Sequence, residues 1–100
     1  AVMIHSKEKD PTEVLSFMKH FKTSISSTIP IIAVPTTYNT ITEKELGNAG
    51  ASIVIHANHL LRAAYPSMKD TAESILLHGR SMEADKDLMS VKEILTMIPE

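Results

Sequence analysis

Polar side chains follow each of three apolar runs in the sequence, and their types are suited to binding an anion. His5 and Ser6 come after the first run, Thr36 after the second and Asn58 after the third. Imidazole, hydroxyl and amide groups can hold a carboxylate or a phosphate, and such hydrogen bonds are stronger where one partner is charged. If these residues meet in the fold, we expect them to bind a small anionic substrate.

The three runs have the character of parallel strands. They cover residues 1–4, 29–34 and 52–57, and each is rich in β-branched residues and almost continuously apolar. That pattern is typical of strands covered on both faces, which favours parallel pairing. Since α/β proteins place their active sites at the carboxyl ends of parallel strands, the polar residues are expected on one common rim.

Helix signals lie between the runs. Asp10-Pro11-Thr12-Glu13 combines an N-cap acceptor, a proline and an acid, and predicts a helix that gives way to a loop over residues 23–28. A capping box at Thr42 and Glu45 predicts a short helix that Gly50 ends, and Ser90 and Glu93 repeat the box before a last helix.

The longest helical pattern covers residues 59–78 and contains Pro66. A proline removes one backbone hydrogen bond and crowds the preceding turn, so we expect either a kink or two segments, the second beginning at Pro66. Residues 80–89 are polar and precede the terminal helix.

The predicted order is βαβαβα plus a short C-terminal helix. We expect a single partial α/β domain over residues 1–100, with three βα units over 1–79 and the polar segment and terminal helix over 80–100. Three parallel strands alone leave open sheet edges, and a complete barrel of eight βα units takes about 250 residues. The chain is therefore expected to be part of a (β/α)8 barrel.

Composition excludes several classes of partner. The net charge is −2, with 43% hydrophobic residues and no cysteine. Because the sequence has no basic patch, its charge gives no reason to expect binding to nucleic acid or to a membrane surface. The apolar runs are too short to span a bilayer. We expect a cytoplasmic protein.

Each candidate residue also has a structural interpretation. His5 can be a capped residue at a strand end, Thr36 a turn residue after Pro35, and Asn58 the cap of the long helix. The histidines lack a ligand-like spacing and the acids near residue 85 look solvated, so no metal ligand can be named in this chain.

Three ordered motifs resemble one enzyme family. They are Met3-Ile4-His5-Ser6-Lys7, Val34-Pro35-Thr36-Thr37-Tyr38 and Ala57-Asn58-His59-Leu60-Leu61-Arg62-Ala63. They are similar to the last three strands of the phosphoenolpyruvate phosphomutase and phosphonopyruvate hydrolase group of the isocitrate lyase superfamily, across essentially the whole chain. Residues 85–94 resemble the mutase C-terminus, where the hydrolases diverge, and this favours the mutase.

The resemblance implies the last three βα units of a TIM-type barrel in an isomerase. That enzyme interconverts phosphoenolpyruvate and phosphonopyruvate, the entry to phosphonate biosynthesis, with Mg²⁺ holding the substrate. His5 would be catalytic and would contact the phosphoryl group, and Ser6 beside it would bind substrate. Thr36 and Asn58 would hold these residues in position without contacting the substrate themselves. Arg62 lies in the third motif without an assigned role.

The family's magnesium-binding acids and its catalytic loop belong to the first five strands, which this sequence does not contain. We therefore expect a C-terminal portion, produced separately or left by a split or truncated gene, that is inactive by itself. A phosphonopyruvate hydrolase is the alternative enzyme. A non-catalytic assembly module is the alternative of another class, because the superfamily implies a homo-oligomer through the helix after Asn58, with an apolar stripe of Leu60, Leu61, Met68, Ile75 and Leu76.

Overall fold

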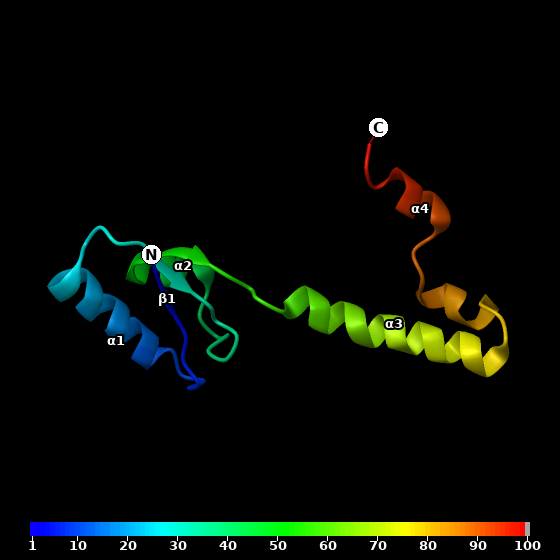
Figure 1. The fold of residues 1–100 in the computed structure, drawn as a ribbon, viewed down its shortest axis with the longest axis horizontal. Helices are drawn as coiled ribbons and strands as arrows, with labels where there is room; N and C mark the ends of the chain where they lie inside the picture. Colours follow the sequence, from blue (N-terminus) through cyan, green and yellow to red (C-terminus); the bar gives the residue numbers. More distant parts are fainter. Residues whose placement is uncertain (100) are drawn as a thin grey trace. The chain divides into compact units, whose positions relative to one another are not determined.

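The computed structural model describes residues 1–99, which form two compact units divided after Asn58. The first unit contains strands and helices in alternation: β1 (Val2–Ile4), α1 (Thr12–His20), a π-helical turn (Phe21–Ile25), β2 (Ile31–Ala33), α2 (Glu43–Ala49) and β3 (Ala51–Val54). The second is helical: α3 (His59–His78), a 3₁₀ segment (Met82–Asp87) and α4 (Val91–Thr96). Figure 1 shows this order along the chain.

The three strands form one parallel sheet in the order β1-β2-β3, as their apolar character predicted. Each strand is shorter than its apolar run, but the register keeps their carboxyl ends level: Ile4 pairs with Ala33, and Ala33 pairs with Val54. Because the ends are level, the residues that follow each strand begin at the same edge of the sheet.

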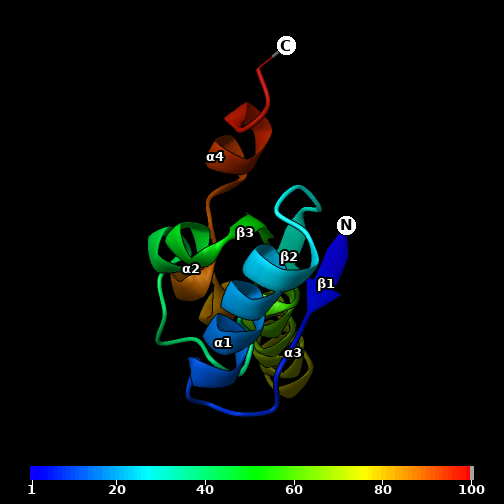
Figure 2. The ribbon, with the colours of Figure 1, turned by 90° about the vertical axis from the view of Figure 1, so that its left-hand side faces the viewer.

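Within residues 1–58, helices cover only one face of the sheet. Figure 2 shows α1 and α2 on the same side of the strands. Their apolar side chains pack with the sheet and the loop after β2 in one buried core, formed by Val14, Met18, Phe21, Ile31, Ala33, Tyr38 and Leu46. Burying this set provides the main stabilisation of the unit.

The other face of the sheet carries a row of apolar residues in register. Met3 pairs with Ile32 and Ile32 pairs with Ile53, and the outer two side chains are 62% and 51% exposed. The prediction of two covered faces is therefore wrong for this unit taken alone. In a closed barrel this face would point inward, where side chains from the other strands fill the interior.

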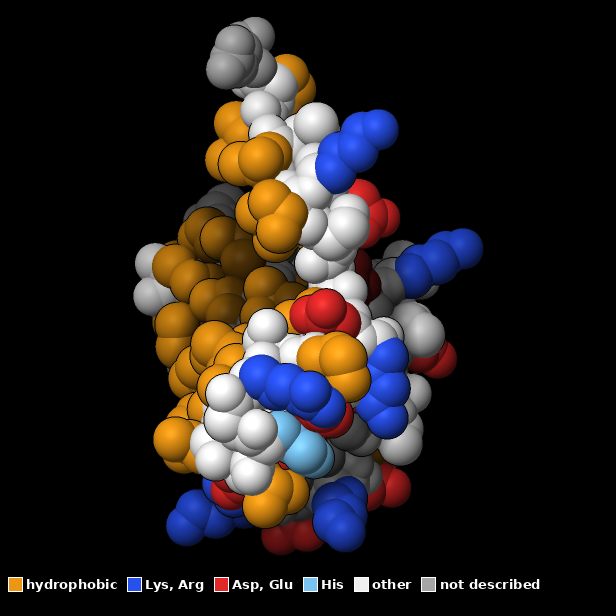
Figure 3. Space-filling view, turned by 90° about the vertical axis from the view of Figure 1, so that its right-hand side faces the viewer, with side chains coloured by type: hydrophobic (Ala, Val, Ile, Leu, Met, Phe, Trp, Pro, Cys, Tyr) orange, Lys and Arg blue, Asp and Glu red, His pale blue; other side chains and the backbone are white. Residues whose placement is uncertain are grey.

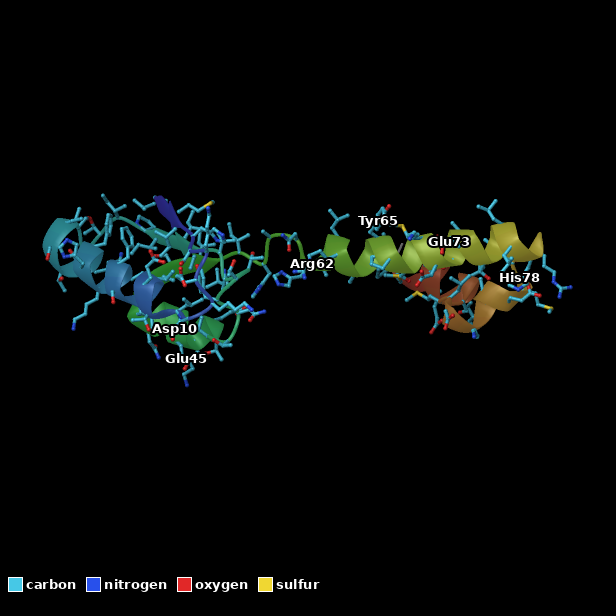
Figure 4. The ribbon with its side chains drawn as sticks, turned by 90° about the horizontal axis from the view of Figure 1, so that it is seen from below. Asp10, Glu45, Arg62, Tyr65, Glu73 and His78 are labelled. Carbon is cyan, nitrogen blue, oxygen red and sulfur yellow. The ribbon has the colours of Figure 1, made fainter. Side chains whose placement is uncertain are left out.

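The first helix begins one residue later than its start signal predicted, and it also ends differently. Pro11, which the signal places at the first helical position, is instead the N-cap residue before Thr12. The Asp10 carboxylate accepts a hydrogen bond from the Thr12 N–H at 2.8 Å, at the N-terminus shown in Figure 4. At the other end a π-helical turn replaces the predicted start of the loop, with the Ser26 N–H donating to the Phe21 carbonyl at 2.8 Å. Phe21, which lies at helical spacing from Val14 and Met18, is the first residue of this turn and is buried in the core.

The capping boxes predicted at Thr42 and at Ser90 are present, whereas Asp10 and Glu13 do not form one at α1, because the Glu13 carboxylate accepts from Ser6 instead. At α2, the Thr42 hydroxyl accepts from the Glu45 N–H at 3.2 Å, and the Glu45 carboxylate accepts from the Thr42 N–H at 2.8 Å. Ser90 and Glu93 make the same pair of bonds at α4. Gly50, with φ of 118°, ends α2 in the left-handed conformation that glycine adopts without strain.

In the second unit, α3 runs unbroken through Pro66. The predicted second segment beginning at Pro66 is therefore wrong. A proline removes one backbone hydrogen bond from the helix. The hydrogen bonds of the turns before and after it are sufficient to hold a helix of this length together. α3 packs with the 3₁₀ segment, whose Ala84 is buried, and this packing makes the unit compact from residue 59 onward. The grouping of residues 1–79 as three βα units remains a prediction about the assembled barrel.

We predict that the α2 capping box weakens in acid. The bonds from Thr42 hold the pKa of the Glu45 carboxyl below its usual range, so the carboxylate stabilises the fold above that range and the stabilisation is lost as the pH falls through the lowered pKa. Glu45→Ala should lower the urea midpoint at neutral pH and leave it unchanged once the wild-type carboxyl is protonated.

Two variants control this measurement. Thr42→Ala removes the N-cap acceptor and should cost about 1 kcal/mol at neutral pH. Glu73→Ala removes an exposed carboxylate 3.6 Å from Lys69 on α3, an arrangement that contributes little. If Glu45→Ala lowered the urea midpoint equally at neutral pH and at acidic pH, the ionised Glu45 carboxylate would not be the group that stabilises the helix start.

Candidate active site

The carboxyl edge of the sheet collects side chains from the loops and from the first turns of the helices. His5 follows β1, residues 35–39 follow β2, and Asn58 lies beyond β3. Each crossover helix starts from this edge, because parallel strands are joined by a connection that leaves at the carboxyl end and returns to the amino end. The first turns of α1 and α2 therefore bring Glu13 and Glu43 to the same edge.

His5 is exposed and joins the ends of two strands. Its Nδ1 lies 3.3 Å from the Val34 carbonyl oxygen, just past the end of β2. A carbonyl only accepts hydrogen bonds, so Nδ1 must carry the proton in this contact and Nε2 is directed elsewhere. The imidazole is thus held at the rim by one nitrogen with the other available to a ligand.

Ser6 is buried, with 5% of its surface exposed. Its hydroxyl donates to the Glu13 carboxylate and accepts from the Glu8 N–H at 3.0 Å. These bonds tie the loop after β1 to the first turn of α1. The substrate contact expected of Ser6 stays a prediction, and making it would require the hydroxyl to leave one of these partners.

Thr36 is brought to the same place as His5. Its N–H donates to the Val34 carbonyl at 2.9 Å, so that oxygen receives bonds from both residues. Asn58 is exposed and stands directly before α3, and Arg62 is exposed on that helix (Figure 4). The contacts at the rim therefore unite the ends of β1 and β2, while the supporting role expected of Asn58 remains a prediction.

Tyr38 is a rim residue that sequence reasoning did not single out. It is fully buried, and its hydroxyl accepts a hydrogen bond from the Val34 N–H at 3.2 Å. Burial raises the pKa of Tyr38 above its ordinary value, and the bond from Val34 partly offsets the rise. Its ring lies 6.5 Å from that of His5, centroid to centroid. The available signal was a large aromatic residue in an otherwise polar loop.

A second pair that the sequence did not indicate links α2 to β3. Glu43, the first residue of α2, lies 2.7 Å from Nε2 of His56, which follows β3. Both side chains are exposed, so the pair contributes little to stability. It does add a carboxylate and an imidazole to the edge of the sheet that carries His5.

Within residues 1–99, no group of three histidine, aspartate or glutamate side chains is placed to hold a metal ion. Among the acids near residue 85, Glu83 pairs with the Arg80 guanidinium at 2.6 Å, and this bond lowers the pKa of the Glu83 carboxyl. Over the same residues, no helix combines the length and the apolar character that crossing a membrane requires.

We predict that Ser6→Ala destabilises the first unit by about 1–3 kcal/mol, because it leaves the Glu13 carboxylate and the Glu8 N–H without their partner. The measurement is chemical denaturation of the 100-residue chain. Ser67→Ala on α3 is the matched control, since Ser67 contributes its backbone carbonyl, not its hydroxyl, to the bond with Thr71. Equal midpoints for the two variants would show that the Ser6 hydroxyl has no structural role.

Comparison with known proteins identifies one group of enzymes. Residues 1–76 match the family model described as phosphoenolpyruvate phosphomutase. A phosphonopyruvate hydrolase from Variovorax sp. (strain Pal2) is 37% identical over 98 residues, which are 97% of this chain and 32% of that protein.

Solved structures of the same group of enzymes also match this chain. A phosphoenolpyruvate phosphomutase from Streptomyces platensis subsp. rosaceus matches with a TM-score of 0.79 and 38% identity, over 95% of this chain and 32% of its own. A phosphonopyruvate hydrolase in complex with oxalate and Mg²⁺ matches with a TM-score of 0.74 and 37% identity, over 93% and 32%. The chain thus spans about a third of the length of these relatives.

Proposed function

We propose that this chain, which belongs to the phosphoenolpyruvate phosphomutase family, is the C-terminal part of a barrel enzyme that interconverts phosphoenolpyruvate and phosphonopyruvate. The observation that carries the proposal is the position of His5. Its imidazole is exposed at the carboxyl edge of the sheet and held there by the neighbouring strand, where a barrel enzyme binds its substrate.

The proposed reaction moves a phosphoryl group between two atoms of one molecule. The bond from phosphorus to the enol oxygen breaks, the electron pair left on the enolate forms the new bond from carbon to phosphorus, and no external oxidant or reductant is needed. Groups that stabilise the moving charge must already be in place. With both ring nitrogens protonated, His5 would keep Nδ1 on the Val34 carbonyl and donate from Nε2 to a phosphoryl oxygen, which is a charge-assisted bond.

The neighbouring residues take supporting roles in this proposal. Ser6 lies next to His5 in the chain and would bind substrate if its hydroxyl turned from Glu13. Thr36 would hold the Val34 carbonyl, and Asn58 would support the rim from the end of β3. We place the enzyme in the cytoplasm. This chain has no cysteine and so forms no disulfide, and it therefore does not need an oxidising compartment.

Magnesium is present in one of the related hydrolase structures. The described residues of this chain do not offer a ligand set for it, so the ligands would come from the part of the barrel that this chain lacks. When bound, the ion would neutralise charge on the substrate's oxygens. The 100 residues alone are therefore proposed to be inactive.

A phosphonopyruvate hydrolase is the second candidate, because a hydrolase is 37% identical over nearly the whole chain. Phosphorus NMR of the full-length protein with phosphonopyruvate separates the two. A mutase converts it to phosphoenolpyruvate, whereas a hydrolase releases inorganic phosphate and pyruvate. Release of phosphate without isomerisation would reject the mutase.

We predict that His5→Asn in the full-length protein lowers kcat/KM by about 100-fold or more, as expected for loss of a group that stabilises transition-state charge. The control is His20→Asn, which changes an exposed histidine in the last turn of α1. If the two variants were equally active, His5 would have no part in the reaction.

The chain also presents a surface suited to assembly. No residue of α3 is buried within the described structure, and Leu60 and Leu76 are 87% and 83% exposed. Figure 3, which views the chain from the end of the second unit, shows hydrophobic side chains exposed on its surface. We propose that α3 packs against another copy of the chain through the stripe of Leu60, Leu61, Met68, Ile75 and Leu76, whether or not the chain takes part in catalysis.

Light scattering tests this surface. The chain should have at least the mass of a dimer, and Leu61→Glu with Leu76→Glu should shift it to the monomer, because charges would be buried in the interface. Asp70→Lys, an exposed change on the opposite side of the same helix, should leave the mass unchanged. A monomeric wild-type chain at high concentration would contradict the proposed contact.

A further inference from the structure

The backbone of Val34 lies between His5 and Tyr38. Its N–H donates to the Tyr38 hydroxyl at 3.2 Å. Its carbonyl oxygen accepts from Nδ1 of His5 at 3.3 Å and from the Thr36 N–H at 2.9 Å. One residue past the end of β2 therefore connects a buried phenol to the exposed imidazole of the candidate site, through the two peptide groups on either side of its Cα.

The Tyr38 hydroxyl replaces a partner that the sheet does not supply. Val34 is one residue past the end of β2, and a buried backbone N–H without a partner costs about 1–3 kcal/mol. Because the ring of Tyr38 is fully buried as part of the core of the first unit, its hydroxyl holds a set position. The backbone of Val34 is thereby held on both sides of its Cα, at the N–H of the Ala33–Val34 peptide and at the carbonyl of the Val34–Pro35 peptide.

We propose that Tyr38 is a positioning residue for His5: it fixes the backbone of Val34, whose carbonyl accepts from the Nδ1–H and so turns Nε2 of the ring toward the ligand. In the neutral ring this contact favours the Nδ1–H form, and in the protonated ring it leaves the Nε2–H to donate to a phosphoryl oxygen. The consequence for catalysis rests on the proposed function. The effect on the imidazole does not, because it follows from the contacts within this chain.

A purely structural role for Tyr38 predicts a different result. In that case the ring matters only as core volume, and Phe at position 38 would leave His5 unchanged. If the hydroxyl positions Val34, removing it frees the carbonyl to reorient, and the imidazole loses its preference for a proton on Nδ1. The state of the His5 ring therefore distinguishes the two roles, whereas stability does not.

The test is ¹⁵N NMR of the 100-residue chain labelled at histidine, at a pH where the His5 ring is neutral. The nitrogen shifts report which ring nitrogen carries the proton. We expect the Nδ1–H form to predominate in the wild type. Tyr38→Phe should shift the ratio toward Nε2–H by about three- to tenfold, the effect of losing one hydrogen bond of ordinary strength.

The matched control is Tyr65→Phe, because Tyr65 is the other tyrosine of the chain and is exposed on α3 (Figure 4). It should leave the His5 ratio unchanged. Two results would overturn the proposal: a wild-type ring that is mainly Nε2–H, or a Tyr38→Phe variant that folds and keeps the wild-type ratio.

A second measurement applies if Tyr38→Phe does not fold. In a Tyr65→Phe background, incorporation of 3-fluorotyrosine labels Tyr38 alone and weakens its oxygen as an acceptor without removing it. A shift toward Nε2–H would support the proposal, and an unchanged ratio would reject it. Since neither readout needs turnover, an inactive full-length enzyme with the expected ring shift would reject the proposed function and leave the positioning role intact.

Discussion

Parallel pairing with level strand ends is the constraint on which the candidate site depends. The register that sets Ile4 beside Ala33 and Ala33 beside Val54 brings three separate loops to one edge. With that register, His5 reaches the carbonyl of Val34, although the two residues are 29 positions apart in sequence. A shift of β1 by one residue would turn its side chains to the opposite faces and remove the imidazole from this contact.

The two faces of the sheet explain why the chain behaves as part of a larger barrel. One face packs against α1 and α2 around the buried core of the first unit. The other leaves Met3 and Ile53 exposed in a row with Ile32, which is where a barrel would place its interior. The chain covers about a third of the relatives' length, which agrees with one face of the sheet being covered by helices and the other being exposed.

Some features were predictable from sequence because their causes are local. Thr42 with Glu45, and Ser90 with Glu93, are three residues apart and satisfy each other's backbone groups, so the starts of α2 and α4 follow from the sequence. Pro66 did not end α3, because the loss of one bond is small beside the many that remain in a twenty-residue helix. Glu13 and Tyr38 were missed at the site because their roles depend on partners that only the fold brings close.

The sequence by itself determined that the chain has parallel strands, where each strand ends in polar residues, and which family its motifs resemble, because these depend on residue type and spacing along the chain. Only the tertiary structure decided what those polar residues contact. It bonded the Ser6 hydroxyl to the Glu13 carboxylate and held His5 at the rim through the Val34 carbonyl. It also made the Tyr38 hydroxyl the acceptor for the Val34 N–H at the end of β2. The physical reason is that a hydrogen bond depends on distance and direction in space, and residues far apart in sequence acquire these only when the sheet and its helices pack.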